Sequence, residues 1–406
     1  MNLQQITASL LDNLFRRTLR CLNSTGFTCD FKDMRKELLK YVKRIVIKIG
    51  SGVISDNGGL DSALIEALCA DVVALYNKGY EVVIVSSGAV AAGKGDLGIT
   101  GRPETIPLQQ AAAAIGQSRL MRTYKDAFRK HGKTVGQILL TRDDLANRRR
   151  FLNARNTLMT LLEHGVIAVV NENDSVVVDE IRFGDNDNLS AMTTNLAEAS
   201  LLVIMSDVDG LFDRNPHTDD KATLIPLVER VDAKIEQMAG ESVTAVGTGG
   251  MNSKVKAAKR ATLYGVGVAI INGRSPNALT RLLDGEEIGT YFLPASNRLT
   301  ARKHWIAFTK KPRGKLFLDE GACKALLERG KSLLPSGIAS IEGVFDRGDA
   351  VRLCDLEGNE VAKGVINYSQ SELEKIKGEN TTRIETILGY KYSDEVVHRD
   401  NMVLNN

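Results

Sequence analysis

Short apolar runs alternate with longer amphipathic segments between residue 44 and about residue 285. The apolar runs are rich in β-branched residues, as buried strands are, and lie at 45–49, 82–85, 134–140, 166–170, 201–205 and 266–271. Segments of helical length and periodicity separate them, among them 61–78, 108–131 and 153–164. Strands that alternate with helices predict an α/β domain in which a mostly parallel sheet is sandwiched by helices.

The pattern changes after this region. Residues 294–314 are rich in Arg, Lys and Thr and contain the single tryptophan, Trp305, which indicates a linker. Beyond it, short strand-like runs lie at 315–318, 337–345, 350–353 and 360–367, with a helix-like segment at 321–329. We therefore expect a small, β-barrel-like C-terminal domain.

The first residues fit neither pattern. Arg16, Arg17 and Arg20 beside several leucines resemble a targeting peptide, but three aspartates in the same stretch weaken that interpretation. We favour a translation start at Met34 or a loosely ordered extension. The expected division is an extension at 1–41, the α/β domain at 42–300, a linker at 301–314 and the small domain at 315–400.

Composition excludes several function classes. The chain has 406 residues, and its 53 Lys and Arg against 50 Asp and Glu give a net charge of only +3, which disfavours a general binder of nucleic acid or membranes. No run of 18 apolar residues predicts a membrane span. The five cysteines form no C-x-x-C pair and the five histidines are scattered, so we expect free thiols, a cytoplasmic location and no Cys/His metal site.

Small and polar residues follow the predicted strands. Gly50-Ser51-Gly52 follows the first strand and Ser86-Ser87-Gly88 the second, and the segments 171–174 and 206–210 follow two later ones. In open α/β sheets, ligands bind outside the carboxyl ends of the strands. Each loop alone is typical of an ordinary turn, but together the loops predict a ligand-binding site at this edge of the sheet.

Charged and glycine-rich positions suggest phosphate chemistry. Lys48 lies inside an apolar strand, where its ammonium either reaches the strand end or points at a phosphate. The segment 247–254 combines glycines, hydroxyls and Lys254 at the start of a helix, which fits either a phosphate loop or a surface turn. The acidic segments 171–174 and 184–188 lack the spacing of a calcium-binding EF-hand, and a solvated turn is their alternative.

Two motif matches mislead. Residues 93–98 fit G-x-G-x-x-G but lie several residues beyond the second strand, and His398-Arg399-Asp400 fits a protein-kinase catalytic loop with no later segment to complete it. No G-x-x-x-x-G-K-[ST] sequence occurs, which disfavours a P-loop enzyme.

A series of segments in a fixed order resembles the amino-acid kinase family, most closely its glutamate 5-kinase branch. The segments are 47–51, 85–89, 116–120, 151–155, 171–174, 184–188, 206–207 and 247–254. Residues 326–335 resemble the start of a PUA domain. The resemblance covers about 43–400 and implies ATP-dependent phosphorylation of the L-glutamate γ-carboxylate, the first step of proline biosynthesis.

The resemblance also implies residue roles. Lys48 and Lys254 would flank the transferred phosphoryl group, and Asp187 would orient them. Ser87, Asp174 and Asn186 would bind glutamate, with Asp185 supporting their loop. The ATP-binding residues would be Lys48, Ser206, Asp207, Thr248, Gly249, Gly250, Met251, Asn252, Ser253 and Lys254. No side-chain metal ligands are assigned, and Mg²⁺ would accompany ATP.

Further partners follow from the same resemblance. It implies feedback inhibition by free L-proline, a homo-oligomer of two or four subunits, and RNA as a partner of the PUA domain. Two alternatives stay open: another acyl kinase of the family, acting on N-acetylglutamate, aspartate or UMP, and an RNA-binding protein. Segments 171–174 and 184–188 argue against the first, and the near-neutral charge against the second.

Overall fold

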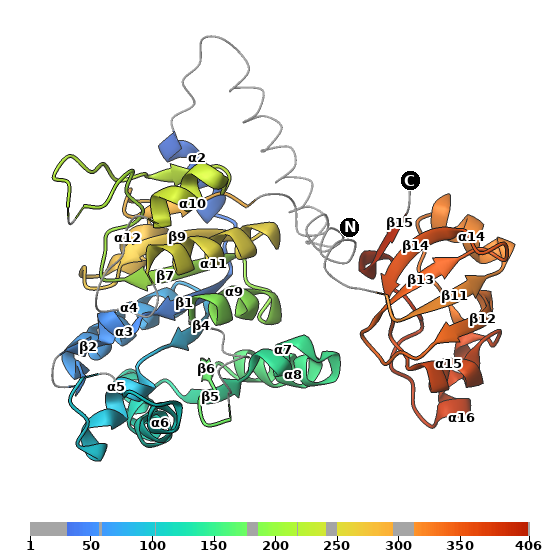
Figure 1. Ribbon diagram of the computed structural model, residues 1–406, viewed down its shortest axis with the longest axis horizontal. Helices are drawn as coiled ribbons and strands as arrows, with labels where there is room; N and C mark the ends of the chain where they lie inside the picture. The colour runs from blue at the N-terminus through green and yellow to red at the C-terminus, as the bar shows by residue number, and fades with distance from the viewer. Residues whose placement is uncertain are drawn as a thin grey trace, which may run out of the picture. The chain divides into compact units, whose positions relative to one another are not determined.

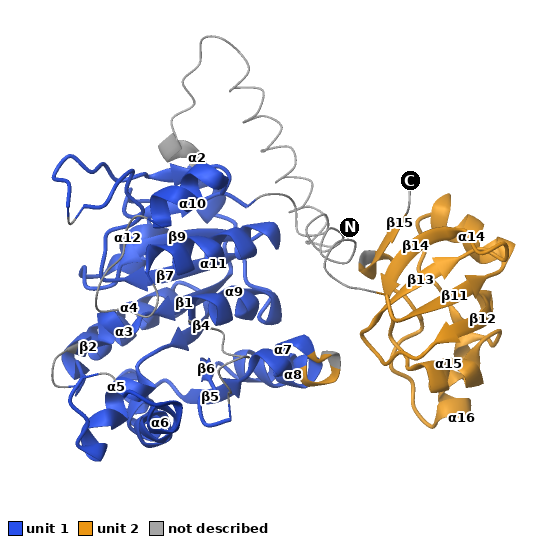
Figure 2. Ribbon diagram, viewed as in Figure 1, with its two compact units in different colours: residues 1–146, 151–297 blue, residues 147–150, 298–406 orange. Residues whose placement is uncertain are grey.

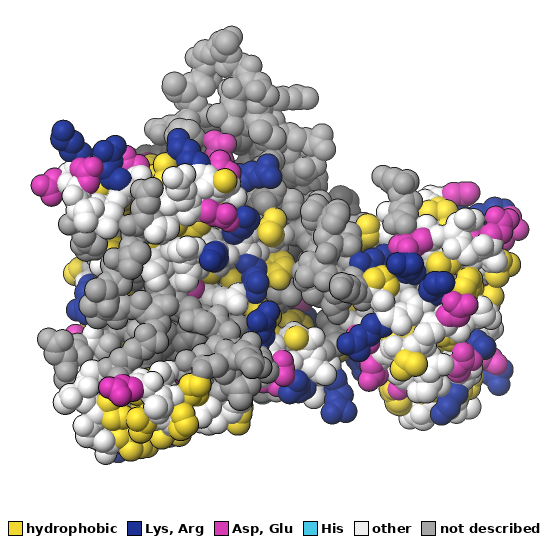
Figure 3. Space-filling view, in the orientation of Figure 1, with side chains coloured by type: hydrophobic (Ala, Val, Ile, Leu, Met, Phe, Trp, Pro, Cys, Tyr) yellow, Lys and Arg dark blue, Asp and Glu magenta, His cyan; other side chains and the backbone are white. Residues whose placement is uncertain are grey.

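The computed structural model describes residues 31–56, 59–101, 103–176, 186–216, 218–240, 250–294 and 312–404. The chain forms two compact units (Figure 2). Unit 1 lies within Met1–Ala146 and Phe151–Asn297, and unit 2 within Asn147–Arg150 and Arg298–Asn406. On the face in view, basic and acidic side chains are interspersed (Figure 3), as the small net charge suggests.

Unit 1 is built on a sheet of eight described strands in the order β5-β6-β4-β1-β7-β9-β10-β8 (Figure 1). Neighbours pair in parallel except β9 and β10, which are antiparallel. The strands are β1 (Arg44–Ile49), β4 (Glu81–Ser86), β5 (Val135–Leu140), β6 (Ile167–Glu172), β7 (Leu201–Ser206), β8 (Leu227–Val228), β9 (Gly267–Asn272) and β10 (Thr290–Phe292). The predicted α/β class is confirmed, and all six predicted strands are present.

Helices cover both faces of this sheet. One apolar core joins the sheet to α3 (Ser51–Ile54), α4 (Ser62–Asn77), α6 (Ile106–Arg129) and α12 (Ala278–Leu283). The core on the other face joins it to α7 (Arg142–Ala146), α8 (Arg148–Glu163), α9 (Asn186–Leu196), α10 (Ala233–Gly240) and α11 (Met251–Leu263). The shorter elements are β2 (Ser55–Asp56), β3 (Gly59–Leu60), α5 (Ala89–Gly93) and η1 (Lys94–Leu97).

The folded unit begins earlier than residue 42. Helix α2 (Phe31–Leu39) packs on unit 1, and Leu39 is 2% exposed within its core. Arg35 is also buried, donates to the Ile288 carbonyl at 2.6 Å and lies over the Tyr291 ring. The helix is too short for its periodicity to be read from the sequence. Residues 1–30 lie outside the described part of the chain.

The backbones of α5 and α6 touch through two glycines. A Cβ on Gly93 would lie 2.1 Å from the Ala112 oxygen, and a Cβ on Gly116 would lie 1.9 Å from the Ala89 oxygen. These distances are far inside van der Waals contact, so only glycine fits at either position. Because α5 starts directly after Ser87 and Gly88, this contact fixes the end of β4.

We predict that Gly116→Ala destabilises unit 1. The added methyl group must push α5 away from α6, at a cost of about 1–3 kcal/mol or more, as for other overpacked positions. Urea unfolding of this variant should show the loss, whereas Gly95→Ala, where a Cβ meets open space, should stay close to the parent. Equal stability of the two variants would contradict the contact.

Unit 2 is a five-stranded sheet with the order β12-β11-β13-β14-β15. Its strands are β11 (Gly314–Leu318), β12 (Ile338–Gly343), β13 (Ala350–Cys354), β14 (Glu360–Val365) and β15 (Met402–Leu404). They pack with α14 (Glu320–Leu327), α15 (Gln370–Ile376) and α16 (Ile384–Leu388) around a separate core. The 3₁₀ helices of this unit are η3 (Pro335–Gly337), η4 (Thr381–Arg383) and η5 (Arg399–Asn401). Most of the expected linker falls on 295–311, outside the described residues.

Within the described residues, no helix combines the length and the apolar character that crossing a bilayer requires. Cys69, Cys323 and Cys354 are free thiols, and the remaining two cysteines lie outside the described residues.

Candidate active site

The alternation of side chains along β1 places Lys48 beneath α9 and α11. Ile45, Ile47 and Ile49 point into the core on the side of α4 and α6, so Val46 and Lys48 point to the other face. Lys48 is only 3% exposed. A buried ammonium is costly unless an anion meets it, so its partner decides its role.

That partner is Asp187, in the first turn of α9. Its side chain is buried, and Oδ1 lies 2.6 Å from Lys48 Nζ. Oδ2 lies 3.6 Å from Lys254 Nζ and accepts a hydrogen bond from Ser253 Oγ at 2.5 Å. The N-terminal end of a helix also stabilises a carboxylate. One buried carboxylate therefore holds both lysines.

Helix α11 supplies Ser253 and Lys254 together. It starts after Gly250, and Ser253 Oγ also contacts the Gly250 carbonyl at 3.0 Å. Lys254 is 6% exposed. Lys48, Asp187 and Lys254 carry a combined charge of +1 in a buried place, which favours the binding of an anion such as a phosphate group.

Asn186, one residue before Asp187, joins the site to the end of β4. Its Nδ2 donates to Ser87 Oγ at 2.9 Å, to the Ser86 carbonyl at 3.2 Å and to Asn171 Oδ1 at 3.0 Å. Asn171, at the end of β6, in turn donates to Gln117 Oε1 at 2.8 Å. Adjacent residues of α9 thus serve a lysine pair and an amide network.

This network offers both a donor and an acceptor to a ligand. Asn186 Oδ1 and Gln117 Nε2 are buried and have no hydrogen-bond partner among the described residues. Buried polar atoms are nearly always paired in folded proteins, so a small ligand with an ammonium and a carboxylate would complete both. Neither Gln117 nor Asn171 could be assigned a role of its own from the sequence, because an amide side chain does not indicate a site by its spacing alone.

The support behind Ser87 is rigid. Ser86 Oγ and the Tyr124 hydroxyl lie 2.9 Å apart in the core, and burial raises the pKa of Tyr124 well above its ordinary value. Gly88 has φ of 103°, a left-handed conformation, and its Cβ position lies 3.2 Å from Ile54 Cδ1. A side chain there would be strained and crowded. Ser87 is therefore held by groups on both sides.

The glycine loop after β1 lies against the end of β7. Ser206 Oγ donates to Asp207 Oδ1 at 3.0 Å, and a Cβ on Gly52 would lie 3.4 Å from Asp207 Oδ2. A Cβ on Gly50 would lie 3.5 Å from Lys48 Nζ. Arg274, which the sequence did not indicate, donates to the Gly52 carbonyl at 2.8 Å. The glycines thus keep space open beside Lys48 and Asp207.

The structure locates the other predicted residues to different extents. Asp174 lies in the turn after β6, and Met251 and Asn252 open α11. Asp185, Thr248 and Gly249 lie outside the described residues. The misleading G-x-G-x-x-G match belongs to the end of α5 and to η1, and does not form a strand-to-helix turn. Among the described residues, no cluster of three His, Cys, Asp or Glu side chains could hold a metal.

Comparisons with known proteins identify the family of this chain. The model of the amino acid kinase family matches residues 43–272, and that of the PUA domain matches residues 314–388. A protein of Syntrophotalea carbinolica called glutamate 5-kinase is 67% identical over 371 residues, which are 91% of this chain and 100% of the relative. A protein of Geobacter sulfurreducens with the same name is 56% identical over 372 residues, again 91% of this chain and 100% of the relative.

One solved structure shows a more distant likeness. UMP kinase from Bacillus anthracis aligns with 63% of this chain and 97% of its own, at 18% identity and a TM-score of 0.44, which is too weak a likeness to carry an argument. The family match and the full-length relatives are decisive without it. This chain belongs to the amino acid kinase family and carries a PUA domain after its kinase unit.

Proposed function

We propose that this chain is a glutamate 5-kinase, which transfers the γ-phosphoryl group of ATP to the γ-carboxylate of L-glutamate. The observation that carries the proposal is the pair Asn186-Asp187 at the start of α9. Asp187 holds Lys48 and Lys254, while Asn186 contacts Ser87 and Asn171. In this proposal a phosphate site and a glutamate site meet at adjacent residues. The relatives called glutamate 5-kinase support the choice of acceptor.

The chemistry needs charge neutralisation and no general base. A glutamate side chain has a pKa of about 4.3, so its carboxylate is already ionised at neutral pH. One carboxylate oxygen forms a bond to the γ-phosphorus as the bond from that phosphorus to the bridging oxygen breaks, and ADP leaves. The acceptor and the triphosphate are both anionic, so their alignment and the neutralisation of their charge decide the rate.

Lys48 and Lys254 would supply this neutralisation of charge. An ammonium group has three N–H donors, so a lysine held by Asp187 can also donate to a phosphoryl oxygen. The nucleotide would enter as its Mg²⁺ complex, with the ion as part of the substrate. Ser206, Asp207 and the segment 248–254 would bind this nucleotide. Ser87, Asp174, Asp185 and Asn186 would bind glutamate.

We predict that Asp174→Ala raises KM for glutamate far more than KM for ATP. Asp174 follows the strand that ends beside Asn171, and its carboxylate is suited to the substrate ammonium. Loss of a hydrogen-bonded charge pair should cost about 1.5–3 kcal/mol of binding, or roughly a tenfold to a hundredfold change. Steady-state kinetics with each substrate varied would measure it. Equal rises in both KM values would rule out this role.

A panel of acceptors tests the substrate. Purified protein with MgATP should release ADP with L-glutamate and should turn over far more slowly with N-acetylglutamate, aspartate or UMP. Faster turnover with one of the latter three would keep the family and overturn the proposed substrate. No turnover with any acceptor, from folded protein, would reject the kinase activity itself.

We further propose that free L-proline inhibits the enzyme as an end product, by competing at the Ser87–Asn186 site. Inhibition that rises with proline and falls with glutamate would support this, and inhibition independent of glutamate would contradict it.

We also propose a homo-oligomer of two or four subunits, to be measured by light scattering. The cytoplasm, where ATP and glutamate are available, is the proposed location.

A second activity, RNA binding by unit 2, is favoured by one feature of its sheet. Lys315, Arg352 and Lys363 stand directly opposite one another on β11, β13 and β14. Like charges in such cross-strand positions repel, so the row is more stable when it meets an anion. Glu342 and Glu360 offset part of this charge, at 3.4 Å from Lys315 and 3.2 Å from Arg352.

The full chain tests this second activity. Its affinity for single-stranded RNA should fall steeply with salt, and Arg352→Gln with Lys363→Gln should weaken it. Lys391→Gln, which removes an exposed lysine from the same unit outside the row, is the matched control. Salt-independent binding, or equal losses in the control, would reject the role.

A further inference from the structure

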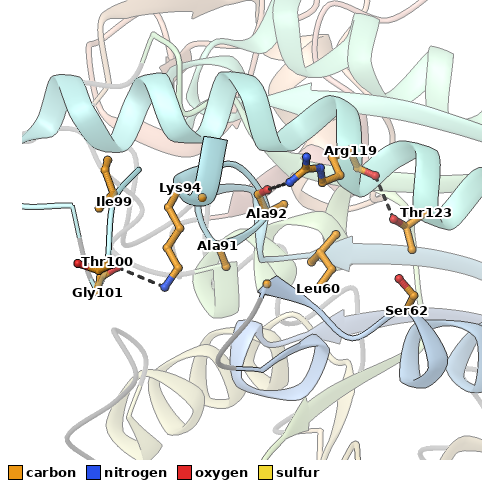
Figure 4. Close-up of a pocket in the computed structure, with 12 residues that line it drawn as sticks. Leu60, Ser62, Ala91, Ala92, Lys94, Ile99, Thr100, Gly101, Arg119 and Thr123 are labelled. Atoms are coloured by element: carbon orange, nitrogen blue, oxygen red, sulfur yellow. Dashed lines mark hydrogen bonds between the residues drawn. The ribbon is translucent and has the colours of Figure 1, made fainter. Parts of the chain in front are cut away.

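A cavity of about 480 Å³ lies outside the candidate active site, between the β2–β3 hairpin, the start of α4, and α5, η1 and α6 (Figure 4). Its lining contains two cations, three hydroxyl side chains and a group of small apolar side chains. They are Lys94 and Arg119; Ser62, Thr100 and Thr123; and Leu60, Ala91, Ala92 and Ile99. Among the described residues that line the cavity, none is acidic and none belongs to the candidate active site.

The positive charge of this cavity is only partly offset. Arg119 donates to the Ala92 carbonyl at 3.0 Å and lies 3.1 Å from Asp96, which is outside the lining. Lys94 donates to the Gly101 carbonyl at 3.3 Å and has no carboxylate partner in the described part of the chain. Figure 4 shows these two cations on different parts of the lining. The cavity therefore attracts a negatively charged group.

The lining also limits the chemistry of a ligand. The volume of the cavity lies in the range found for small-molecule binding sites, about 300–1,000 Å³. Arg and Lys bind carboxylate or phosphate, hydroxyls add hydrogen bonds, and the apolar side chains suit a short aliphatic chain. Among the described residues of the lining, no acidic side chain is present to receive an ammonium. A small organic anion fits this lining better than a zwitterionic amino acid does.

The cavity connects two segments that support the active site. Leu60 and Ile54 pack on Gly88, where a Cβ would lie 3.6 Å and 3.2 Å from their side chains. The hairpin that carries Leu60 follows the Gly50–Gly52 loop, and α5 follows Ser87. Because α5 is locked to α6 by Gly93 and Gly116, Lys94 and Arg119 belong to one rigid wall. A ligand that bridges hairpin and wall fixes the two loops relative to each other.

We propose that this cavity is an activating effector site for a small organic anion with a carboxylate or phosphate group on a short aliphatic chain. Binding there fixes the hairpin, whose Leu60 packs on Gly88, against the α5–α6 wall before glutamate arrives, so it lowers KM for glutamate. Only this effect on KM rests on the proposed function, because occupancy of the cavity does not depend on catalysis.

Calorimetric titration of the full chain tests the binding. Succinate and glycerol 3-phosphate serve as probes for the two anionic groups, and alanine serves as a zwitterion of similar size. We expect binding of at least one anion and none of alanine. Lys94→Gln and Arg119→Gln should each weaken it about tenfold or more, as expected for a hydrogen bond to a charged group. If one variant fails to fold, the affinity of the other variant for the anion still tests the proposal.

Two control variants separate this cavity from other cationic places. Lys78→Gln removes an ion-paired lysine outside the lining, and Lys48→Met removes the lysine of the active site. Both should bind the probe as the parent does. Absence of binding by both anions, equal binding in Lys94→Gln and Arg119→Gln, or loss of binding in Lys48→Met would overturn the proposal.

Kinetics test the regulatory part. A probe that binds should lower KM for glutamate by about fivefold or more, the usual size of coupling between two sites, and this effect should disappear in Lys94→Gln. An unchanged KM with a bound probe would overturn the effector role. A chain that binds the probe but never phosphorylates glutamate would instead reject the proposed function, so the two failures are distinguishable.

Discussion

Replacement of Lys48 or Lys254 by methionine should lower kcat by about 10²–10³-fold, with a much smaller change in either KM. Both ammonium groups lie on one buried carboxylate, within 2.6 Å and 3.6 Å of its oxygens. We propose that they meet the negative charge of the transferred group there, and removal of one such preorganised group typically costs about 3–4 kcal/mol of transition-state stabilisation. Methionine retains most of the volume of the lysine side chain.

Pre-steady-state and steady-state kinetics with saturating substrates measure this effect. Lys78→Met is the matched control, because Lys78 is a lysine of unit 1 whose side chain is 43% exposed and paired with Asp284 on the surface. It should keep the parental kcat. A methionine variant at position 48 or 254 with kcat within about threefold of the parent would show that the lysine does not contact the transferred group.

Replacement of Asp187 by asparagine should lower the free energy of unfolding by about 3–5 kcal/mol, the cost of leaving a buried charge without its partner. Asparagine has nearly the same shape, so packing is preserved while two buried lysines lose their shared carboxylate. Urea unfolding followed by a probe of unit 1 measures this loss. Activity should fall as well, because both lysines lose their orientation.

A double variant separates charge from shape. Lys48→Met combined with Asp187→Asn removes one of the stranded cations, so it should be more stable than Asp187→Asn alone. Asp71→Asn offers a comparison, because Asp71 is also buried but, among the described residues, accepts hydrogen bonds only from Leu279 and Thr280. Stability of Asp187→Asn within about 1 kcal/mol of the parent would contradict the buried ion pairs.

The central fold could be predicted from the sequence because its strands are fully buried. A strand covered on both faces reads as a continuous apolar run, which is why β1, β4 and β7 stand out. Strands β8 and β10 have only two and three residues and carry no periodicity. Gly79 and Gly132, which lie just after α4 and α6, have φ of 91° and 67°, the left-handed conformation in which glycine commonly ends a helix.

The site could be predicted only where residue type is itself unusual. A lysine inside an apolar strand is rare, so Lys48 was visible, and its meeting with Asp187 was implied only by resemblance. The amides of Asn171 and Gln117 are common in turns and helices, and their pairing depends on two distant segments meeting. The contact of Arg274 with Gly52 joins residues 222 positions apart and has no local signal.

The proposed phosphoryl transfer is tested most directly by following the γ-carboxylate oxygen of glutamate into the phosphate that is released. L-Glutamate labelled with ¹⁸O in its γ-carboxylate is incubated with the protein, MgATP and hydroxylamine, which captures an acyl phosphate as a hydroxamate and releases its phosphate. We predict γ-glutamyl hydroxamate together with phosphate that contains one ¹⁸O atom from glutamate. Unlabelled phosphate without hydroxamate would show that water, and not the carboxylate, attacks ATP, and would contradict the proposed transfer.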